Sequence, residues 1–575
     1  MKKISFGFRK NHYFLVLFFL SMLNMLFMHY QILYTVGIEF YFGKTSYIDN
    51  FLAVFLDVTI ILMFFLLISW GRGKISLLAT FVITLLLSFC NVLYSRFFGQ
   101  YLTLSAMGQV GNLNDNVVMQ SVLSEFRIHD VYYLLIPIIF FLVYLKSKRK
   151  VIVKDGLSVI GKIWVVVLLL LLASHSFYLV KGSFGRAIQS IFPSYAFNMA
   201  YPNWVTFHKG LTRTLIVDNL VNNGIKKDLS QEQINEIEKE YHNHRERRTG
   251  HTLDQNIKNV IFIIVESYLA VTSDLKVDGK EITPNMNALK RESNVYYNGH
   301  VQSHAKIGKS SDGQLIYMTG LLPLRSEITV SRALKDSLVG LPRMLLEHGI
   351  VKHTRIMVPT APSFWEQKAM NQAYGIEKMY SKYDYMGGKN QDDLADELVF
   401  KFARQLDDEM PPSSFSLVLT LSMHEPFDEC VEHGFHLEDP NLPTRYRNYL
   451  TTCHYFDEQI GKYIDHLKAD GLYDNSLIVI AADHDAHPKF LDMEGKVERD
   501  LPLYIINGGI DSSQAWTGPC NQLDVYTTLL DILGVESEWR GLGHTLLNRN
   551  YTYSVTDKTW ELSEWIINGD YFGRK

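Results

Sequence analysis

Five apolar stretches in the first 180 residues restrict the fold of this chain more than any other feature. They lie near residues 12–34, 51–70, 76–98, 131–145 and 161–180. A helix of about 20 residues crosses the ~30 Å hydrocarbon core of a bilayer. Buried core helices of a soluble protein fit poorly, because such cores rarely contain runs like VVVLLLLLA. We therefore expect about five membrane-spanning helices, of which the fourth is the shortest.

Basic residues predict how these helices cross the membrane. Cytoplasmic loops carry an excess of Lys and Arg. Such residues cluster before the first stretch, between the second and third, and between the fourth and fifth: Lys2, Lys3, Arg9, Lys10, Arg72, Lys74, Lys146, Lys148, Arg149, Lys150, Lys154 and Lys162. The alternation predicts a multi-pass protein of a bacterial cytoplasmic (inner) membrane. Its N-terminus is cytoplasmic and everything after residue 180 is extracytoplasmic or periplasmic. No small-residue cleavage site follows the first stretch, which predicts an uncleaved anchor.

Charge and cysteine content exclude two classes of function. The net charge of −4 and the lack of a long basic tract outside the membrane-flanking loops argue against a nucleic-acid partner. The four cysteines form no CxxC pair, which argues against a cysteine zinc site. A disulfide such as Cys430–Cys453 stays open. Asp57 lies within the second stretch, where a carboxylate is costly. A functional role, a polar partner and a water-filled cleft are three open interpretations of Asp57.

Three regions follow from these patterns: a transmembrane domain over 1–180, a helical connector over 181–255 and an extracytoplasmic head over 256–575. In the connector, Ser230 and Gln233 have the spacing of a capping box, which predicts a helix that begins after Ser230. Its many charged residues predict a solvated spacer between membrane and head.

Apolar runs alternate with helical patterns in the head. IKNVIFIIVES, SFSLVLTLSMH and NSLIVIAADHD are short runs typical of strands that are buried on both faces, and HTRIMVPT and LPLYIING are weaker examples. Helices are expected over 334–348, 391–408 and 445–468. Strands separated by helices predict an α/β domain with a mostly parallel central sheet flanked by helices.

Polar side chains follow the three strongest strands. Glu266 ends the first run, His424 the second, and Asp483 and His484 the third. Ligands of open α/β sheets bind at the carboxyl ends of strands, so we expect these side chains to converge. Two carboxylates and an imidazole suit Mn²⁺, Mg²⁺ or Zn²⁺. The sequence therefore predicts a site for one divalent metal ion.

The segment GKSSDGQLIYMTGLLP supplies a hydroxyl nucleophile at the start of an expected helix. A serine bound at a metal site loses its proton more easily and becomes nucleophilic. Ser311 and Gln314 also have capping-box spacing. One serine can therefore cap the helix while the other reacts, and the residues alone do not select between Ser310 and Ser311.

These motifs resemble the lipoteichoic acid synthase-like, phosphoglycerol transferase branch of the alkaline phosphatase/sulfatase superfamily. That branch has five membrane spans and an extracytoplasmic sulfatase-like head. Its motifs match here as VIFIIVES, GKSSD for the usual G-K-T-S-D, SMHEPF and the Asp-His pair. The resemblance implies that Ser310 is the nucleophile and also a metal ligand. The other metal ligands it implies are Glu266, Asp483 and His484, with Mn²⁺ as the preferred ion, and it implies that His424 contacts substrate.

The substrate segment departs from the family pattern H-x-D-x-x-x-F-W-x-R. Here it reads VPTAPSFWEQ, which retains Trp365 but places Gln367 where the family has its arginine. An arginine fork is a natural clamp for phosphate, so its loss bears on whether the group is phosphoglycerol. Trp365 and Gln367 are expected in the substrate site, with His487 from DHDAHP as a further contact. SSDGQL lacks the Pro/Ala and Arg of sulfatase motifs, which disfavours sulfate ester hydrolysis.

The expected activity is metal-dependent transfer of a phospho-head group. The donor is a membrane phospholipid with a phosphoglycerol- or phosphoethanolamine-type head. The acceptor is an envelope glycan or lipid, and the route passes through a covalent intermediate on Ser310. Two alternatives are carried: a membrane-anchored phosphodiesterase, phosphatase or sulfatase-like hydrolase, and a non-catalytic head that binds the envelope.

Overall fold

The computed structural model forms two compact units, a membrane unit between residues 12 and 215 and a head between residues 228 and 574. It describes residues 12–36, 46–69, 73–98, 101–102, 125–146, 202–215, 228–246, 251, 253, 256–325, 327–333, 337–362, 364–385, 395–409, 411–427, 434–486, 491–493, 495–511 and 513–574.

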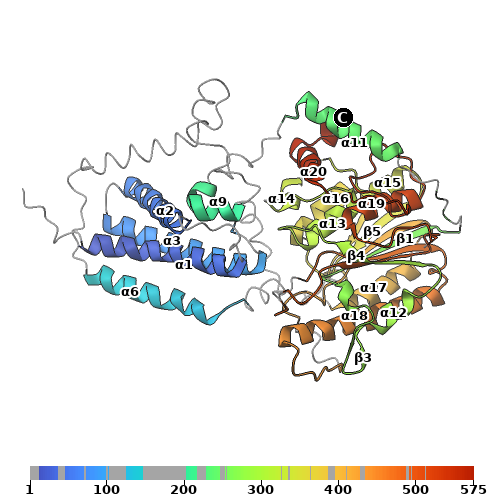
Figure 1. The fold of residues 1–575 in the computed structure, drawn as a ribbon, viewed down its shortest axis with the longest axis horizontal. Helices are drawn as coiled ribbons and strands as arrows, with labels where there is room; N and C mark the ends of the chain where they lie inside the picture. Colours follow the sequence, from blue (N-terminus) through green and yellow to red (C-terminus); the bar gives the residue numbers. More distant parts are fainter. Residues whose placement is uncertain are drawn as a thin grey trace, which may run out of the picture. The chain divides into compact units, whose positions relative to one another are not determined.

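Four long apolar helices make up most of the described part of the membrane unit (Figure 1). They are α1 (His12–Val36), α2 (Ser46–Ile68), α3 (Gly73–Phe98) and α6 (Tyr132–Lys146), the last preceded by the 3₁₀ turn η4 (Ile128–Val131). Each is long and apolar enough to span a bilayer when η4 is counted with α6. They confirm the first four predicted spans, although α2 begins five residues early. The predicted fifth span, 161–180, lies outside the described residues.

Asp57 of α2 is fully buried within the membrane unit and faces protein groups. Its carboxylate lies so close to Gly210 that a Cβ there would come within 2.6 Å of either oxygen. Arg213 supplies an opposite charge nearby. Asn50 of α2 also donates a 2.8 Å hydrogen bond to the Phe207 carbonyl in α9 (Pro202–Lys209). Asp57 therefore lies against residues 210–213, and the three interpretations of its role stay open.

The connector helix α11 (Gln231–Glu246) begins where its capping box predicts. The Gln233 backbone N–H donates to Ser230 Oγ at 3.2 Å, and the Ser230 N–H donates to Gln233 Oε1 at 2.9 Å. The prediction of a solvated spacer is wrong, because α11 packs against α20 (Asp557–Gly569) of the head. Ile237 of α11 is 1% exposed. With Ile234 and Tyr241 it has the i, i+3, i+7 spacing of a helix that packs on one face.

The head contains an eight-stranded sheet in the order β10-β4-β9-β8-β1-β7-β5-β6. The strands are β1 (Asn259–Val265), β4 (Val295–Gln302), β5 (His353–Met357), β6 (Lys378–Tyr380), β7 (Ser414–Leu419), β8 (Ser476–Ala482), β9 (Leu501–Ile506) and β10 (Cys520–Asn521). β9 runs antiparallel to β8 and β4, and the other pairs are parallel. The mostly parallel sheet is confirmed. A small hairpin of β2 (Lys276–Val277) and β3 (Lys280–Glu281) lies apart from it.

Helices cover both faces of the sheet (Figure 1). One layer holds α13 (Ser310–Thr319), α14 (Thr329–Ala333), α15 (Leu341–Glu347), α16 (Gln367–Tyr374), α19 (Gln522–Ile532) and α20. The opposite layer holds α12 (Pro284–Leu289), α17 (Asp396–Asp408) and α18 (Thr444–Ala469). The central strands β1 and β8 are buried along their whole length between these layers.

The three predicted helices of the head have different outcomes. α18 confirms the helix over 445–468, and α17 confirms 396–408 of the helix over 391–408. The helix over 334–348 is wrong in its first part, because residues 337–340 are not helical and α15 begins at Leu341. Gly340 stands at its N-cap in an extended conformation, and Pro342 occupies its first turn, which is where proline is tolerated.

Candidate active site

The register of two neighbouring strands brings the predicted metal ligands together. β1 and β8 run parallel with Val265 opposite Ala482, so the next residues, Glu266 and Asp483, leave the sheet side by side. The Ser267 backbone N–H donates a 2.8 Å hydrogen bond to Asp483 Oδ1 across this gap. The three-residue group of Glu266, Asp483 and His484 therefore forms at the carboxyl edge of the sheet, as the sequence predicts.

The side chains of this group are close enough to share one cation. One potential ligand atom from each of Glu266, Asp483 and His484 lies within 4.8 Å of the others. His484 Nε2 is 3.3 Å from Glu266 Oε1 and 3.7 Å from Asp483 Oδ2. A cation between these atoms would meet two carboxylates and an imidazole, a donor set that suits Mn²⁺, Mg²⁺ or Zn²⁺.

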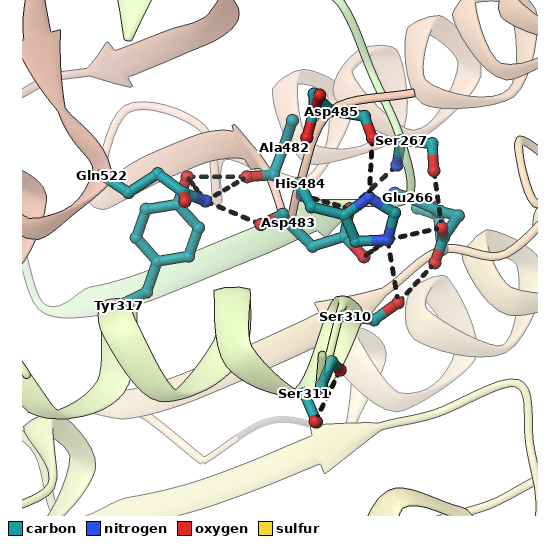
Figure 2. A network of polar contacts seen from close by, with 12 residues as sticks. Glu266, Ser267, Ser310, Ser311, Tyr317, Ala482, Asp483, His484, Asp485 and Gln522 are labelled. Atoms are coloured by element: carbon teal, nitrogen blue, oxygen red, sulfur yellow. Dashed lines mark hydrogen bonds and ion pairs between the residues drawn. The ribbon is translucent and has the colours of Figure 1, made fainter. Parts of the chain in front are cut away.

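Neighbouring groups hold these side chains in orientation (Figure 2). His484 Nδ1 is 3.0 Å from the Asp485 carbonyl oxygen, which can only accept, so Nδ1 carries a proton and Nε2 is the nitrogen that could bind a metal ion. Ser267 Oγ donates to Glu266 Oε1 at 2.8 Å. Asp483 Oδ1 accepts from the backbone N–H groups of Ser267 and His484, at 2.8 and 2.7 Å.

The electrostatics of the buried group favour an added positive charge. Burial, together with the neighbouring charge of Glu266, raises the pKa of Asp483 to about 7. Burial would lower the pKa of His484, but the charges of Asp483 and Glu266 outweigh it and raise that pKa to about 9. Burial alone would raise the pKa of Glu266, yet His484 holds it below its ordinary value. Two buried carboxylates thus require a nearby cation, either the imidazolium or a metal ion.

Metal affinity should therefore rise with pH. A metal ion must displace the protons of Asp483 and His484, whose pKa values are about 7 and about 9. While the pH is below the pKa of such a group, each increase of one pH unit makes its proton easier to displace and lowers the apparent Kd by about tenfold. Calorimetric titration with Mn²⁺ should give a Kd that falls steeply up to pH 7, falls more gently to pH 9 and then levels off. A Kd that stays constant between pH 6 and 9 would contradict this picture.

Ser310 is the first residue of α13, and its hydroxyl lies against the ligand group (Figure 2). Ser310 Oγ donates a 3.0 Å hydrogen bond to Glu266 Oε2 and is 3.4 Å from His484 Nε2. Ser311 Oγ instead donates to the Gly308 carbonyl at 2.7 Å. Ser311 is therefore wrong as the helix cap, because the N-cap position belongs to Lys309, which has a φ of +45°. The structure places Ser310, and not Ser311, beside the group of Glu266, Asp483 and His484.

Three residues that position the site were not identified from the sequence. Gly313 lets α13 approach the end of β8, because a Cβ there would lie 2.1 Å from the Asp483 carbonyl oxygen. Gln522 Nε2 donates to the carbonyls of Asp483 (2.7 Å) and Ala482 (3.3 Å), and Tyr317 OH also donates to Ala482 at 2.7 Å (Figure 2). Of these three residues, only Gly313 can be singled out from the sequence, because a glycine directly after SSD permits close backbone approach.

A cleft beside Ser310 contains most of the predicted substrate residues. His424, Trp365 and Gln367 line it together with Ser310, Glu266 and Asp483. The cleft is open to solvent at its mouth. None of the described residues that line it is Lys or Arg. His487, the remaining predicted contact, lies outside the described residues.

Gln367 stands where the family has an arginine, but its side-chain amide is already engaged by a neighbouring residue. Its Nε2 donates a 2.7 Å hydrogen bond to Asn371 Oδ1 within α16. Trp365 is 9% exposed and has a φ of +48°, a backbone conformation that is rare for a bulky residue. Unusual backbone of this kind is often found at binding sites.

The remaining cysteine and metal candidates lie elsewhere. Cys453 and Cys520 are buried free thiols, whereas Cys430, of the suggested Cys430–Cys453 pair, lies outside the described residues. A second potential ligand group, Asp408, His466 and Asp470, lies at the ends of α17 and α18 with both of its carboxylates exposed.

Two family matches cover most of the chain. Residues 258–535 match the sulfatase family, and residues 1–189 match the lipoteichoic acid synthase N-terminal domain. The first match contains Glu266, Ser310, His424, Asp483 and His484.

Known proteins are similar to this chain over most of its length. Lipoteichoic acid synthase 2 of Bacillus subtilis is 26% identical over 81% of this chain and 73% of its own length. Lipoteichoic acid synthase of Staphylococcus aureus is 24% identical over 87% of this chain and 79% of its own length. The structure of lipooligosaccharide phosphoethanolamine transferase A from Neisseria meningitidis shares the fold over 92% of this chain and 97% of that one, with 14% identity and a TM-score of 0.53. With a sulfatase head behind a lipoteichoic acid synthase N-terminal domain, the chain belongs to the lipoteichoic acid synthase-like membrane branch of the alkaline phosphatase/sulfatase superfamily.

Proposed function

We propose that this protein is a metal-dependent phosphotransferase that moves a phospholipid-derived phospho-head group onto an envelope glycan or lipid. The observation that carries the proposal is the position of Ser310. Its hydroxyl contacts Glu266 and His484 and lines a cleft that is open to solvent. The head groups considered are phosphoglycerol and phosphoethanolamine, since the relatives include lipoteichoic acid synthases and a phosphoethanolamine transferase.

Glu266, Asp483, His484 and Ser310 would hold one divalent ion, for which we propose Mn²⁺. Such an ion lowers the pKa of a hydroxyl and neutralises charge that develops on a phosphoryl group. The buried carboxylates of Glu266 and Asp483 lie side by side, and their negative charges support a resident cation next to them.

The chain's own residues would then act in two steps. In the first, Ser310 Oγ forms a bond to phosphorus as the bond to the diacylglycerol oxygen breaks. Glu266 Oε2, 3.0 Å away, orients the Ser310 hydroxyl, whose proton leaves to solvent through the open cleft. His424, which lines the cleft, protonates the departing oxygen. In the second step, the acceptor hydroxyl gives its proton to His424 and attacks phosphorus. Ser310 Oγ departs and regains a proton from solvent.

The membrane unit fits a lipid donor, because it holds the head near the bilayer in which that donor lies. We propose the topology that the basic residues predict, with a cytoplasmic N-terminus and an extracytoplasmic head. We also retain the division into 1–180, 181–255 and 256–575. His424, Trp365, Gln367 and His487 are the proposed substrate contacts.

A hydrolase is the second candidate, because the cleft is open to solvent and water can compete as the acceptor. Incubation of the detergent-solubilised chain with labelled phosphatidylglycerol or phosphatidylethanolamine separates the two. A transferase should release diacylglycerol faster when a glycolipid acceptor is added and should label that acceptor. Equal rates with all product free in water would identify a hydrolase. No diacylglycerol release from either lipid would favour the non-catalytic, envelope-binding alternative.

A further inference from the structure

The side-chain amide of Gln314 is buried without a hydrogen-bond partner. Gln314 is 4% exposed and lies in the middle of α13. Its Nε2 makes no hydrogen bond to any of the described residues. A buried donor without a partner costs free energy, and such groups are rare in native proteins unless a ligand or water completes them.

The position of Gln314 relates this amide to the reacting serine. Gln314 follows Ser310 by four residues, so both lie on one face of α13. Helical side chains lean toward the helix N-terminus, which brings the Gln314 amide toward the turn that carries Ser310. Both residues line the same cleft, together with Thr360, Trp365 and His424.

The other amide in the cleft already has a partner. Gln367, which stands in place of the family arginine, donates to Asn371 at 2.7 Å. Among the described residues that line the cleft, the only buried side-chain nitrogen without a partner belongs to Gln314. None of these residues is Lys or Arg, so the Gln314 amide is an unpaired neutral donor that the cleft offers to a bound oxygen beside His424.

We propose that Gln314 is a recognition residue, whose amide donates a hydrogen bond to an oxygen of the transferred phospho-head group. This inference rests on the proposed function and adds a binding role on α13 itself. The same helix then supplies both the nucleophile and a contact that holds the group the nucleophile attacks.

The test compares Gln314→Met and Gln314→Glu with the wild type in the full-length protein. Met keeps the length of the side chain and removes both hydrogen-bonding groups, whereas Glu keeps an acceptor and loses the donor. Gln459→Met makes the same change in α18, where Gln459 is 5% exposed and outside the cleft. The donor probes are phosphatidylglycerol, phosphatidylethanolamine and a simple aryl phosphodiester that lacks a head group.

Gln314→Met should lower kcat/KM for the better phospholipid by about 10- to 100-fold, as expected when a ligand oxygen loses its buried partner. Mn²⁺ affinity should be unchanged and Tm should not fall, because an unpaired buried amide is replaced by an apolar group. Gln314→Glu should lose a similar factor, and Gln459→Met should lose none. A merely structural Gln314 would instead lower Tm or metal affinity together with activity.

The aryl phosphodiester shows which substrate oxygen accepts the hydrogen bond from Gln314. An equal loss with both kinds of substrate assigns it to a phosphoryl oxygen, and a loss with the phospholipid alone assigns it to the head group. Unchanged kcat/KM in Gln314→Met, or full activity in Gln314→Glu, would overturn the inference and mean that the amide meets only water. In either case the wild type would still acquire a covalent label on Ser310, so failure here is distinct from failure of the proposed function.

Discussion

Replacement of Ser310 by Ala should reduce head-group transfer by roughly 10⁴-fold or more, since loss of a covalent nucleophile removes the reaction path itself. The change deletes one hydroxyl that bonds to Glu266 at 3.0 Å and leaves α13 otherwise intact. The measurement is release of diacylglycerol from labelled phospholipid, with circular dichroism and Tm to show that the variant folds.

The neighbouring serine supplies a matched control. Ser311→Ala removes a hydroxyl that bonds to the Gly308 carbonyl inside the loop, so a modest loss of stability and retained chemistry are expected. Transfer by Ser310→Ala at the wild-type rate, or a larger loss in Ser311→Ala, would refute the assignment of the nucleophile.

Asp483→Asn should weaken metal binding by more than about 100-fold and abolish transfer with it. Removing a group that only supports a ligand already costs about 10- to 100-fold in affinity, so loss of a charged ligand should cost more. The substitution is conservative for the fold, because Asn keeps an oxygen to accept from the backbone N–H groups of Ser267 and His484. Elemental analysis after dialysis, with Mn²⁺ titration, measures the effect.

The surface group of Asp408, His466 and Asp470 provides the control for this experiment. Asp470→Asn makes the same chemical change in that group and should leave both catalysis and tight metal binding intact. If Asp470→Asn loses the metal and Asp483→Asn retains it, the metal centre has been placed at the wrong group.

Strands and site residues are predictable from the sequence where burial imposes a pattern on it. The strands β1, β7 and β8 are buried on both faces, so each appears as an apolar run that ends in polar residues. Parallel pairing then brings those polar residues to one edge, which is why Glu266, His424, Asp483 and His484 were expected together. The choice of Ser310 over Ser311 came from the motif match, and its contact with Glu266 supports that choice.

Other features depend on contacts that leave no local pattern. β4 carries Asn298 and Gly299 at an irregularity in its pairing with β9, which hides its alternation. Gln522 acts through carbonyls at the end of β8, 39 and 40 positions earlier in the chain. The unpaired amide of Gln314 becomes visible only once its surroundings are known. Ser311 has the spacing of a cap, but the N-cap of α13 lies two residues earlier, at Lys309.

The central claim is that Ser310 carries the transferred group. Intact-mass analysis of the full-length protein, solubilised in detergent with Mn²⁺ and incubated with bacterial phospholipids without acceptor, tests it most directly. We predict an added mass equal to one phospho-head group, located on the peptide that contains Ser310 and absent from Ser310→Ala. Release of diacylglycerol with no added mass, or with the mass on another residue, would contradict the account.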